Sequence, residues 1–292
     1  MKNIQNSELP YDLRIKNYYG ELNTSEKVVA DFLCISAEEV LNLKLLMLSE
    51  VLGVSEATII RFCKNIGYSG YSELKLAIAQ SSGERKVSRE NNAFDINISE
   101  GDKIEELPDK VGAHVIKAMQ DTLKVLDEKE LKKAVKAVVK CRRLFFVGVG
   151  TSACTANDAF TKFIKLGINC VFCSDAHMQL IALANAAKGD VVIAISHSGK
   201  TKDTVDMVRV AKKRRATVIC LTNYKASIIA KYSDISLLTA GYETGFHSET
   251  MISRILQLSI IDMLYLGVTL QDLNMYLKSI ENTNKVLADR AY

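Results

Sequence analysis

The sequence predicts an all-α N-terminal domain joined to an α/β domain with a parallel sheet flanked by helices. Three observations predict this arrangement. Residues 1–80 have helical patterns, residues 81–102 are polar, and the rest of the chain alternates apolar β-branched runs with amphipathic stretches. A length of 292 residues is consistent with about two domains. We therefore expect a helical domain over residues 1–80, a linker over 81–102 and the α/β domain over 103–292.

The composition is that of an ordinary soluble globular protein, with 48% hydrophobic and 25% charged residues. The net charge of +4 is mild and by itself predicts neither a nucleic-acid nor a membrane partner. No apolar run approaches the roughly 20 residues of a membrane span, and the N-terminus lacks the apolar core of a signal peptide. The seven cysteines and four histidines are not spaced as zinc ligands. We expect a cytoplasmic protein with reduced thiols and no metal or cofactor.

Helical segments occupy the chain before residue 45. Residues 11–19 form a short amphipathic segment. For the next helix, Thr24 or Ser25 is the expected N-cap, because hydroxyl oxygens accept hydrogen bonds from the first amides of a helix. Residues 36–39 read Ser-Ala-Glu-Glu, which has the form of a capping box and predicts the start of another short helix.

A helix, a glycine turn and a second helix follow one another at the centre of this domain. Residues 45–52 and 56–66 have helical spacing, with Gly53 in the turn between them and Ser55 as the N-cap of the second helix. This is the layout of a helix-turn-helix. The apolar positions of the second helix are Ile59, Phe62, Cys63 and Ile66. They predict that one face of this helix packs into a small core and that the opposite face is available for a ligand.

In such a motif the first residues of the second helix reach base edges in the major groove of DNA. The expected contacts are Ser55 and Thr58 with phosphates, Glu56, Ala57 and Arg61 with base edges, and Lys64 with the backbone. The alternative is a helical bundle without a DNA partner. Residues 1–80 have eight basic and ten acidic side chains, a net charge of −2, whereas DNA-binding domains are usually basic.

Strand-like runs begin after two expected helices at residues 103–127 and 128–140. The runs cover residues 144–149, 169–173, 191–195, 217–222 and 235–239. Their alternation with helical stretches predicts a parallel sheet with helices on both faces. An apolar helix over residues 251–266 follows, and we expect its apolar surface to pack against both the core and a subunit partner.

Two of these strands run into short turns rich in hydroxyl groups. Positions 150–152 read Gly-Thr-Ser and positions 196–201 read Ser-His-Ser-Gly-Lys-Thr, and a helical stretch follows each turn. A strand, a small polar turn and a helix N-terminus form an anion site, because free amides and the helix dipole converge there. The expected phosphate contacts are Thr151, Ser152, Ser196, Ser198, Gly199 and Thr201. The alternative is an ordinary loop with a Ser/Thr helix cap.

The pair of motifs G-x-G-T-S at 148–152 and S-x-S-G-x-T at 196–201 resembles the sugar isomerase (SIS) domain over roughly residues 125–266. The resemblance implies that this domain binds a phosphosugar. It also implies that the loop before His177 and Gln179 lies near the sugar, so these side chains are candidates for its hydroxyl groups. Glu249, which follows the glycine-containing loop at 241–248, is a further candidate ligand residue.

Residues 22–30, 53–64 and 67–75 resemble the N-terminal domain of the RpiR family of bacterial transcriptional regulators. That family joins such a domain to a C-terminal SIS domain in this order and near this length. The resemblance implies a regulator of sugar metabolism genes that binds double-stranded operator DNA as a homodimer or homotetramer. A phosphosugar effector would change its operator binding.

The alternative within the SIS class is a phosphosugar isomerase, which needs a carboxylate or histidine to move a proton between adjacent carbons. Four side chains could serve as that base: His177, Glu243, His247 and Glu249. They do not form a recognisable catalytic set, and a simple isomerase has no use for a helix-turn-helix. The sequence therefore favours a regulator over an enzyme.

Overall fold

The computed structural model describes residues 9–85, 103–240 and 248–288. The chain divides into two compact units, Met1–Phe94 and Asp95–Tyr292. The first is helical, and the second combines a parallel sheet with helices, as the sequence predicts. Each unit has its own hydrophobic core.

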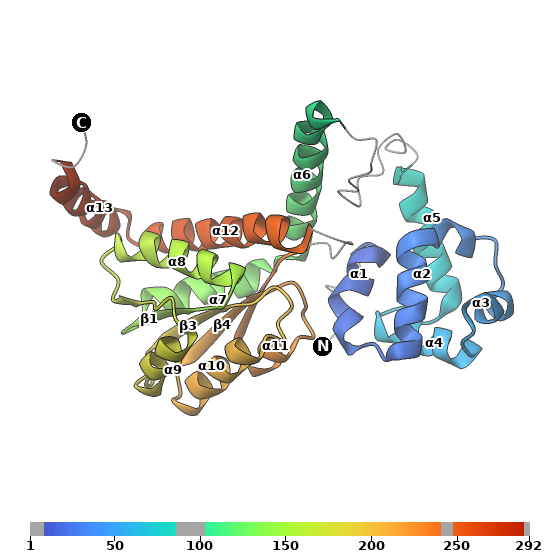
Figure 1. The fold of residues 1–292 in the computed structure, drawn as a ribbon, viewed down its shortest axis with the longest axis horizontal. Coiled ribbons are helices and arrows are strands. Elements are labelled where there is room, and N and C mark those ends of the chain that lie inside the picture. Colours follow the sequence, from blue (N-terminus) through green and yellow to red (C-terminus); the bar gives the residue numbers. More distant parts are fainter. Residues whose placement is uncertain (1–8, 86–102, 241–247, 289–292) are drawn as a thin grey trace. The chain divides into compact units, whose positions relative to one another are not determined.

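The N-terminal unit packs its helices around one apolar core (Figure 1). Its helices are α1 (Tyr11–Tyr18), α2 (Thr24–Val40), α3 (Leu45–Leu52), α4 (Glu56–Asn65) and α5 (Tyr71–Arg85), with a 3₁₀ turn at Tyr19–Glu21. Leu33, Leu48, Phe62 and Leu74 come from four different helices and are at most 1% exposed. These contacts fix the helices against one another, because a buried leucine or phenylalanine contributes roughly 2 kcal/mol.

The N-terminus of α2 is capped differently from the expectation. Asn23, rather than Thr24 or Ser25, is the N-cap. Its Oδ1 accepts a hydrogen bond from the amide of Glu26, and the amide of Asn23 donates to Glu26 Oε2, both at 3.0 Å. This reciprocal pair is a capping box, and it leaves Thr24 and Ser25 exposed in the first turn. Further along, α2 has a kink at Ser36, where a new helix was expected.

Helix α5 extends further than the domain boundary predicted at residue 80. It continues to Arg85 and so includes the first five residues of the expected linker. A helix whose earlier turns are fixed by buried Leu74 and Ile78 can be extended at little cost through polar residues. The remainder of the expected linker, residues 86–102, lies outside the described residues.

The C-terminal unit contains a five-stranded parallel sheet with the strand order β2-β1-β3-β4-β5. The strands are β1 (Leu144–Val147), β2 (Cys170–Val171), β3 (Val191–Ile195), β4 (Thr217–Thr222) and β5 (Ile235–Leu238). The helices are α6 (Leu107–Val125), α7 (Glu128–Val139), α8 (Thr151–Ile164), α9 (Ala176–Ala184), α10 (Lys202–Lys213), α11 (Ile228–Tyr232), α12 (Ser248–Thr269) and α13 (Leu273–Leu287). A short 3₁₀ turn, Ile104–Glu106, precedes α6.

The sheet is covered on both faces (Figure 1). Helices α7, α8 and α12 pack on the face that carries Phe146 and Ile193, whereas α9, α10 and α11 pack on the face that carries Phe145 and Val192. Neighbouring residues of a strand point to opposite faces, so a strand buried on both sides must be apolar at every position. That explains why Val191–Ile195 is a continuous apolar run.

The order of the strands places a topological switch point between β1 and β3. The chain leaves β1 through α8 toward β2, crosses back through α9 to β3, and leaves β3 through α10. The helices that follow β1 and β3, α8 and α10, therefore lie on opposite faces of the sheet. Ligands of open α/β sheets bind at such a switch point.

Helix α12 is mainly a core helix of this unit. Its segment Ile252–Thr269 has a mean hydropathy of 1.3, long and apolar enough for a membrane span, but half of it is buried within the protein. Ile260, Ile261 and Leu264 belong to the core beneath the sheet. Ile255 and Leu266 are 37% and 58% exposed, and the expected contact of this helix with a subunit partner stays a prediction.

An ion pair network ties β1 to β3 at the amino edge of the sheet. The buried carboxylate of Asp190 accepts hydrogen bonds from Arg142 Nη2 at 2.9 Å and Arg143 Nη2 at 2.8 Å. The amide of Ala187 also donates to it. Burial raises the pKa of Asp190, but these hydrogen bonds outweigh it, so the net pKa is below the ordinary value.

Candidate functional site

The predicted helix-turn-helix is present in the N-terminal unit as α3, a turn and α4 (Figure 1). Gly53 ends α3 in the left-handed conformation with φ +64°, and the amide of Val54 donates to Ser49 O at 3.1 Å. Ser55 then caps α4, because its Oγ accepts a hydrogen bond from the amide of Thr58. The turn is therefore closed by local hydrogen bonds at both ends.

The two faces of α4 differ as the spacing predicts. Ile59, Phe62, Cys63 and Ile66 are completely buried. Burial raises the pKa of the Cys63 thiol to about 12, so this cysteine stays protonated and packs as an apolar residue. Most of the predicted DNA contacts lie on exposed positions: Ser55, Glu56, Ala57, Arg61 and Lys64. Thr58 is only 9% exposed, and its hydroxyl pairs with Ser55 Oγ at 2.9 Å.

Arg61 does not extend freely from α4. Its Nε donates to Glu26 Oε1 at 2.7 Å, and Asn65 Nδ2 donates to the same oxygen at 3.1 Å. Neither Glu26 nor Asn65 was predicted from the sequence as a functional residue. The Asn-x-x-Glu spacing at 23–26 indicates the capping box, but no local pattern indicates that its glutamate also reaches a helix more than thirty residues later.

In the C-terminal unit the turn after β3 is held by its own hydroxyl groups. Ser196 Oγ accepts a hydrogen bond from the amide of Gly199 at 3.1 Å and pairs with Thr201 Oγ1 at 3.1 Å. Ser196 itself is 2% exposed, so its hydroxyl holds the turn from the buried side. Ser198 is half-buried on the loop, and Lys200 is exposed beside it. Residues 196–201 form a compact loop, called the cradle below.

The turn after β1 lies next to the cradle. Val147 pairs with Ala194 in the sheet, and a side chain at Gly148 would lie 3.1 Å from the carbonyl oxygen of Ile195. Gly150, with φ +59° and ψ −132°, precedes α8 in a conformation that is essentially restricted to glycine. Thr151 is exposed in the first turn of α8, and Ser152 is 8% exposed. The two predicted phosphate motifs are thus adjacent.

Of the described helices of this unit, α6, α8, α10 and α11 begin without a side-chain cap, whereas α7, α9 and α13 have an aspartate cap. Asp127, Asp175 and Asp272 cap α7, α9 and α13 with their carboxylates. Among the described residues, no side chain caps α8 or α10. The first amides of these two helices are therefore available to an anion. The first turn of α8 contains no acidic residue, whereas that of α10 contains Asp203.

A third loop, which was not predicted from the sequence, supports the cradle. Thr222 Oγ1 and the amide of Asn223 both donate to the carbonyl oxygen of His197, and the His197 ring lies edge-on to Tyr224. Thr222 is the last residue of the buried strand β4 and Asn223 follows it, so this loop has the same position as the predicted turns after β1 and β3. That position was the signal that could have identified them.

The remaining candidate ligand residues lie on α9 and α12. His177 is exposed in the first turn of α9. The structure gives Gln179 a different role: its buried amide accepts from the amide of Gly148 and donates to the carbonyl oxygens of Gly148 and Cys173. Gln179 therefore holds the turn after β1. Glu249 belongs to α12, but its side chain, like Glu243 and His247, lies outside the described residues.

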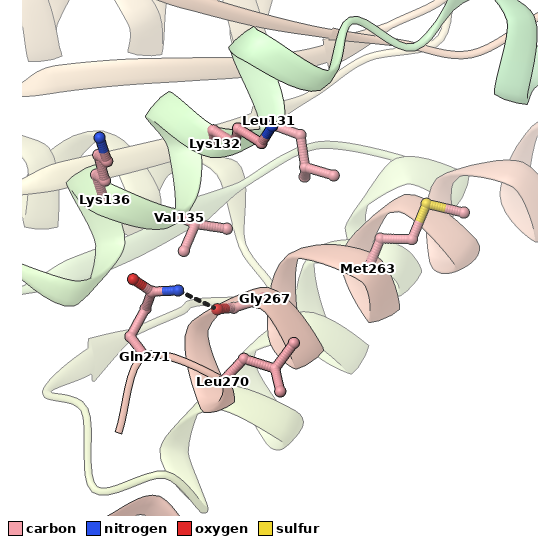
Figure 2. Close-up of a pocket in the computed structure, with 8 residues that line it drawn as sticks. All are labelled: Leu131, Lys132, Val135, Lys136, Met263, Gly267, Leu270 and Gln271. Carbon is pink, nitrogen blue, oxygen red and sulfur yellow. Dashed lines mark hydrogen bonds between the residues drawn. The ribbon is translucent and has the colours of Figure 1, made fainter. Parts of the chain in front are cut away.

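A separate shallow pocket of about 210 Å³ lies between α7 and the C-terminal end of α12 (Figure 2). It is lined by Leu131, Lys132, Val135, Lys136, Met263, Gly267, Leu270 and Gln271. In Figure 2 the Gln271 amide points to the carbonyl oxygen of Gly267, to which it donates at 3.3 Å. This pocket is distinct from the cradle, because its lining comes from α7, α12 and the turn after α12 rather than from the loops after β1 and β3.

Comparisons with known proteins agree with this two-part organisation. The model of the rpiR-family helix-turn-helix domain matches residues 10–84, and the model of the SIS domain matches residues 137–267. An HTH-type transcriptional regulator of Caldanaerobacter subterraneus is 35% identical over 94% of this chain and 96% of that protein. A second such regulator, from Thermotoga maritima, is 33% identical over 93% of this chain and 95% of its own length.

Solved structures share the fold. The Vibrio vulnificus NanR protein complexed with ManNAc-6P has a TM-score of 0.62 at 24% identity, over 96% of this chain and 99% of that chain. The sugar isomerase domain of an RpiR transcription factor from Sphaerobacter thermophilus has a TM-score of 0.57 at 23% identity, over 62% of this chain and 99% of that chain. At these identities the likeness establishes the fold.

Proposed function

Because the chain belongs to the RpiR family of HTH-type transcriptional regulators, we propose that it senses a phosphosugar through its SIS domain and thereby changes its binding to operator DNA. The observation that carries the effector proposal is the pair of uncapped helices, α8 and α10, that begin side by side at the switch point of the sheet. Two helix N-termini with free amides suit the two or more negative oxygens of a phosphate.

In this proposal the phosphate is bound by the cradle and by the first turn of α8. The contacts are the side chains or amides of Thr151, Ser152, Ser196, Ser198, Gly199 and Thr201. Exposed Lys200 adds positive charge at the rim. The sugar itself extends from the phosphate toward His177 and Glu249, where imidazole and carboxylate groups can bond to hydroxyl groups. The NanR structure contains ManNAc-6P, which makes amino-sugar phosphates a natural part of the first ligand panel.

DNA binding uses the exposed face of α4. Ser55 and Thr58 are assigned to phosphates, Glu56, Ala57 and Arg61 to base edges, and Lys64 to the backbone. The support for this assignment is the burial of the opposite face of α4 and the exposure of most of these positions. Because residues 1–80 have a net charge of −2, the affinity for DNA depends on a few well placed cations rather than on a broad basic surface.

The protein acts in the cytoplasm as a homodimer or homotetramer and does not catalyse isomerisation. Exposed apolar residues at the end of α12 and on α13, such as Leu266, Leu273 and Leu277, suit a subunit contact. The effector binds one dimer geometry better than another and so changes the spacing of the two recognition helices. Because His177 is exposed in the first turn of α9, we assign it to sugar binding rather than to general-base catalysis.

A thermal-shift screen of the full chain tests the effector proposal. Phosphosugars and their unphosphorylated parents are compared at equal concentration, because a ligand that binds only the folded state raises the melting temperature. We expect a shift from one or a few phosphorylated sugars and none from the parents. The same hit should change the affinity for operator DNA in a gel-shift assay and should not be converted to another sugar. An equal shift from parent sugars, or conversion of the hit, would contradict the proposal.

A further inference from the structure

We propose that Glu26 is a positioning residue for DNA recognition: it holds Arg61 and Asn65 on the exposed face of α4 without contacting DNA itself. This inference rests on the proposed binding of operator DNA. It extends that proposal, because the predicted contacts include Arg61 but neither Glu26 nor Asn65. If it is correct, operator specificity depends on a residue of α2, outside the helix-turn-helix.

Glu26 connects two helices through its two carboxylate oxygens. Oε2 accepts from the amide of Asn23 and so closes the capping box of α2. Oε1 faces α4 and accepts from Arg61 Nε at 2.7 Å and from Asn65 Nδ2 at 3.1 Å. The two oxygens thus have separate roles, one within α2 and one toward the recognition helix.

The burial of the two partners is unequal. The side chain of Glu26 is 2% exposed, whereas that of Arg61 is 57% exposed. A buried carboxylate is a fixed anchor, because it is costly to leave without its hydrogen-bond donors. The exposed guanidinium is therefore tethered at its base and extends into solvent at its tip.

The tether leaves the DNA-binding edge of Arg61 available. A guanidinium has five N–H donors in a rigid fork, and Nε supplies only one of them. The two terminal nitrogens can still bind O6 and N7 of a guanine or two phosphate oxygens together. Because Glu26 already restricts the side chain, less conformational entropy is lost when the contact forms. Asn65, one helical turn beyond Arg61, is oriented by the same oxygen.

The variant Glu26→Gln separates the two roles of Glu26. Glutamine keeps a capping box, because its carbonyl oxygen can accept from the Asn23 amide. Its NH₂ group then faces Arg61 Nε and Asn65 Nδ2, which are also donors, so the tether is lost while the helix cap remains. Glu73→Gln is the matched control. It removes one negative charge from the same unit, where Glu73 accepts from the exposed amide of Ser69 at 2.6 Å.

The experiment measures a specificity ratio with the full-length protein. This ratio is the dissociation constant for a scrambled DNA duplex divided by that for a selected duplex. One duplex is selected by the wild-type protein from a random-sequence library, and the other is a scrambled duplex of equal composition. We expect Glu26→Gln to lower the specificity ratio about tenfold, which corresponds to the loss of one good bidentate base contact. Binding to the scrambled duplex and the circular dichroism spectrum should change little. Glu73→Gln should retain the wild-type ratio.

A double-mutant cycle with Arg61→Lys identifies the route of the effect. Lysine has a single ammonium group and cannot form the two parallel hydrogen bonds of a guanidinium, so Arg61→Lys alone should lower the specificity ratio. Glu26→Gln should then add little to it, because both changes remove the same contact. An unchanged ratio in Glu26→Gln, or fully additive effects in the cycle, would overturn the inference. A wild-type protein without preference for any duplex would instead contradict the proposed DNA binding.

Discussion

Gly199 of the cradle lies directly against Ser227, the N-cap residue of α11. A side chain on Gly199 would overlap Ser227 and would also lie 2.8 Å from Thr222 Oγ1. The carbonyl oxygen of Gly199 meanwhile accepts a hydrogen bond from the amide of Ile229 at 3.0 Å. The cradle is therefore packed tightly onto the loop after β4, and its backbone has φ +61° at this glycine.

The variant Gly199→Ala should abolish the effector response. The new methyl group must displace Ser227 or the cradle, and alanine also disfavours the positive φ, so we expect a loss of about 1–3 kcal/mol of stability. Because the anion site depends on the position of the cradle amides, a phosphosugar should no longer raise the melting temperature. Scanning calorimetry with and without the ligand measures both effects.

Gly189→Ala is the matched control for this prediction. Gly189 also has a positive φ of +91°, but its nearest neighbouring atom, Arg142 Cβ, is 4.0 Å from the position of the added carbon. This variant should lose stability through strain alone and should keep the full ligand-induced shift. If Gly189→Ala loses the response as well, general destabilisation, rather than the geometry of the cradle, explains the effect.

Ser196→Ala should weaken phosphosugar binding, because it removes a hydroxyl that is a proposed phosphate contact and that also holds the cradle. Its hydroxyl accepts from the Gly199 amide and pairs with Thr201, so its loss frees the turn that presents Ser198 to the ligand. We expect a drop in affinity of about tenfold, on the order of one lost hydrogen bond. Titration calorimetry with the sugar from the thermal-shift screen gives this value. Ser259→Ala, which removes a hydroxyl bonded within α12, should leave the affinity unchanged.

Much of the fold could be predicted because the burial of side chains follows the repeat of the helix or strand that carries them. The apolar residues Ile59, Phe62 and Ile66 are fully buried as their spacing requires, and the strand Val191–Ile195 is buried at every position. The cap of α2 was not predicted correctly, because Thr24 and Ser25 are equally good caps by residue type. Asn23 is the cap because it pairs with Glu26, and Glu26 also contacts α4. Such a long-range contact leaves no local pattern in the sequence.

The positions of the candidate ligand residues were only partly predictable. Residue type and place after a strand identified the cradle and the turn after β1, because parallel strands bring their carboxyl ends to one edge. The role of Gln179 could not be inferred in this way. Its amide fits the backbone of Gly148 and Cys173, and that match depends on the angle between α9 and the sheet.

Asp190→Asn should destabilise the protein at neutral pH by about 3 kcal/mol, because it breaks a buried ion pair with Arg142 and Arg143. The folded-state pKa of Asp190 is lowered, so its contribution is fully present above the unfolded value of about 3.9 and is lost as the pH falls through the folded value. The stability difference between wild type and variant should therefore be constant above about pH 5 and should shrink below about pH 4.

Urea unfolding at a series of pH values measures this difference. A gap that persists unchanged in acid would show that the asparagine side chain disturbs packing rather than charge. Phosphosugar binding at neutral pH should be retained by the variant, because Asp190 precedes β3 at the amino edge of the sheet and the cradle follows β3 at the carboxyl edge.

Replacing Ser55 separates the stability of α4 from its contact with DNA. Ser55→Ala removes the cap and should cost about 1 kcal/mol of stability in the N-terminal unit. Ser55→Asp keeps a good cap and adds a favourable charge at the helix N-terminus, so its stability should match the wild type. If Ser55 contacts a phosphate, however, the carboxylate should repel the DNA and weaken binding to selected and scrambled duplexes alike. Fluorescence anisotropy with both duplexes tests this, and wild-type affinity in a stable Ser55→Asp variant would remove Ser55 from the DNA contacts.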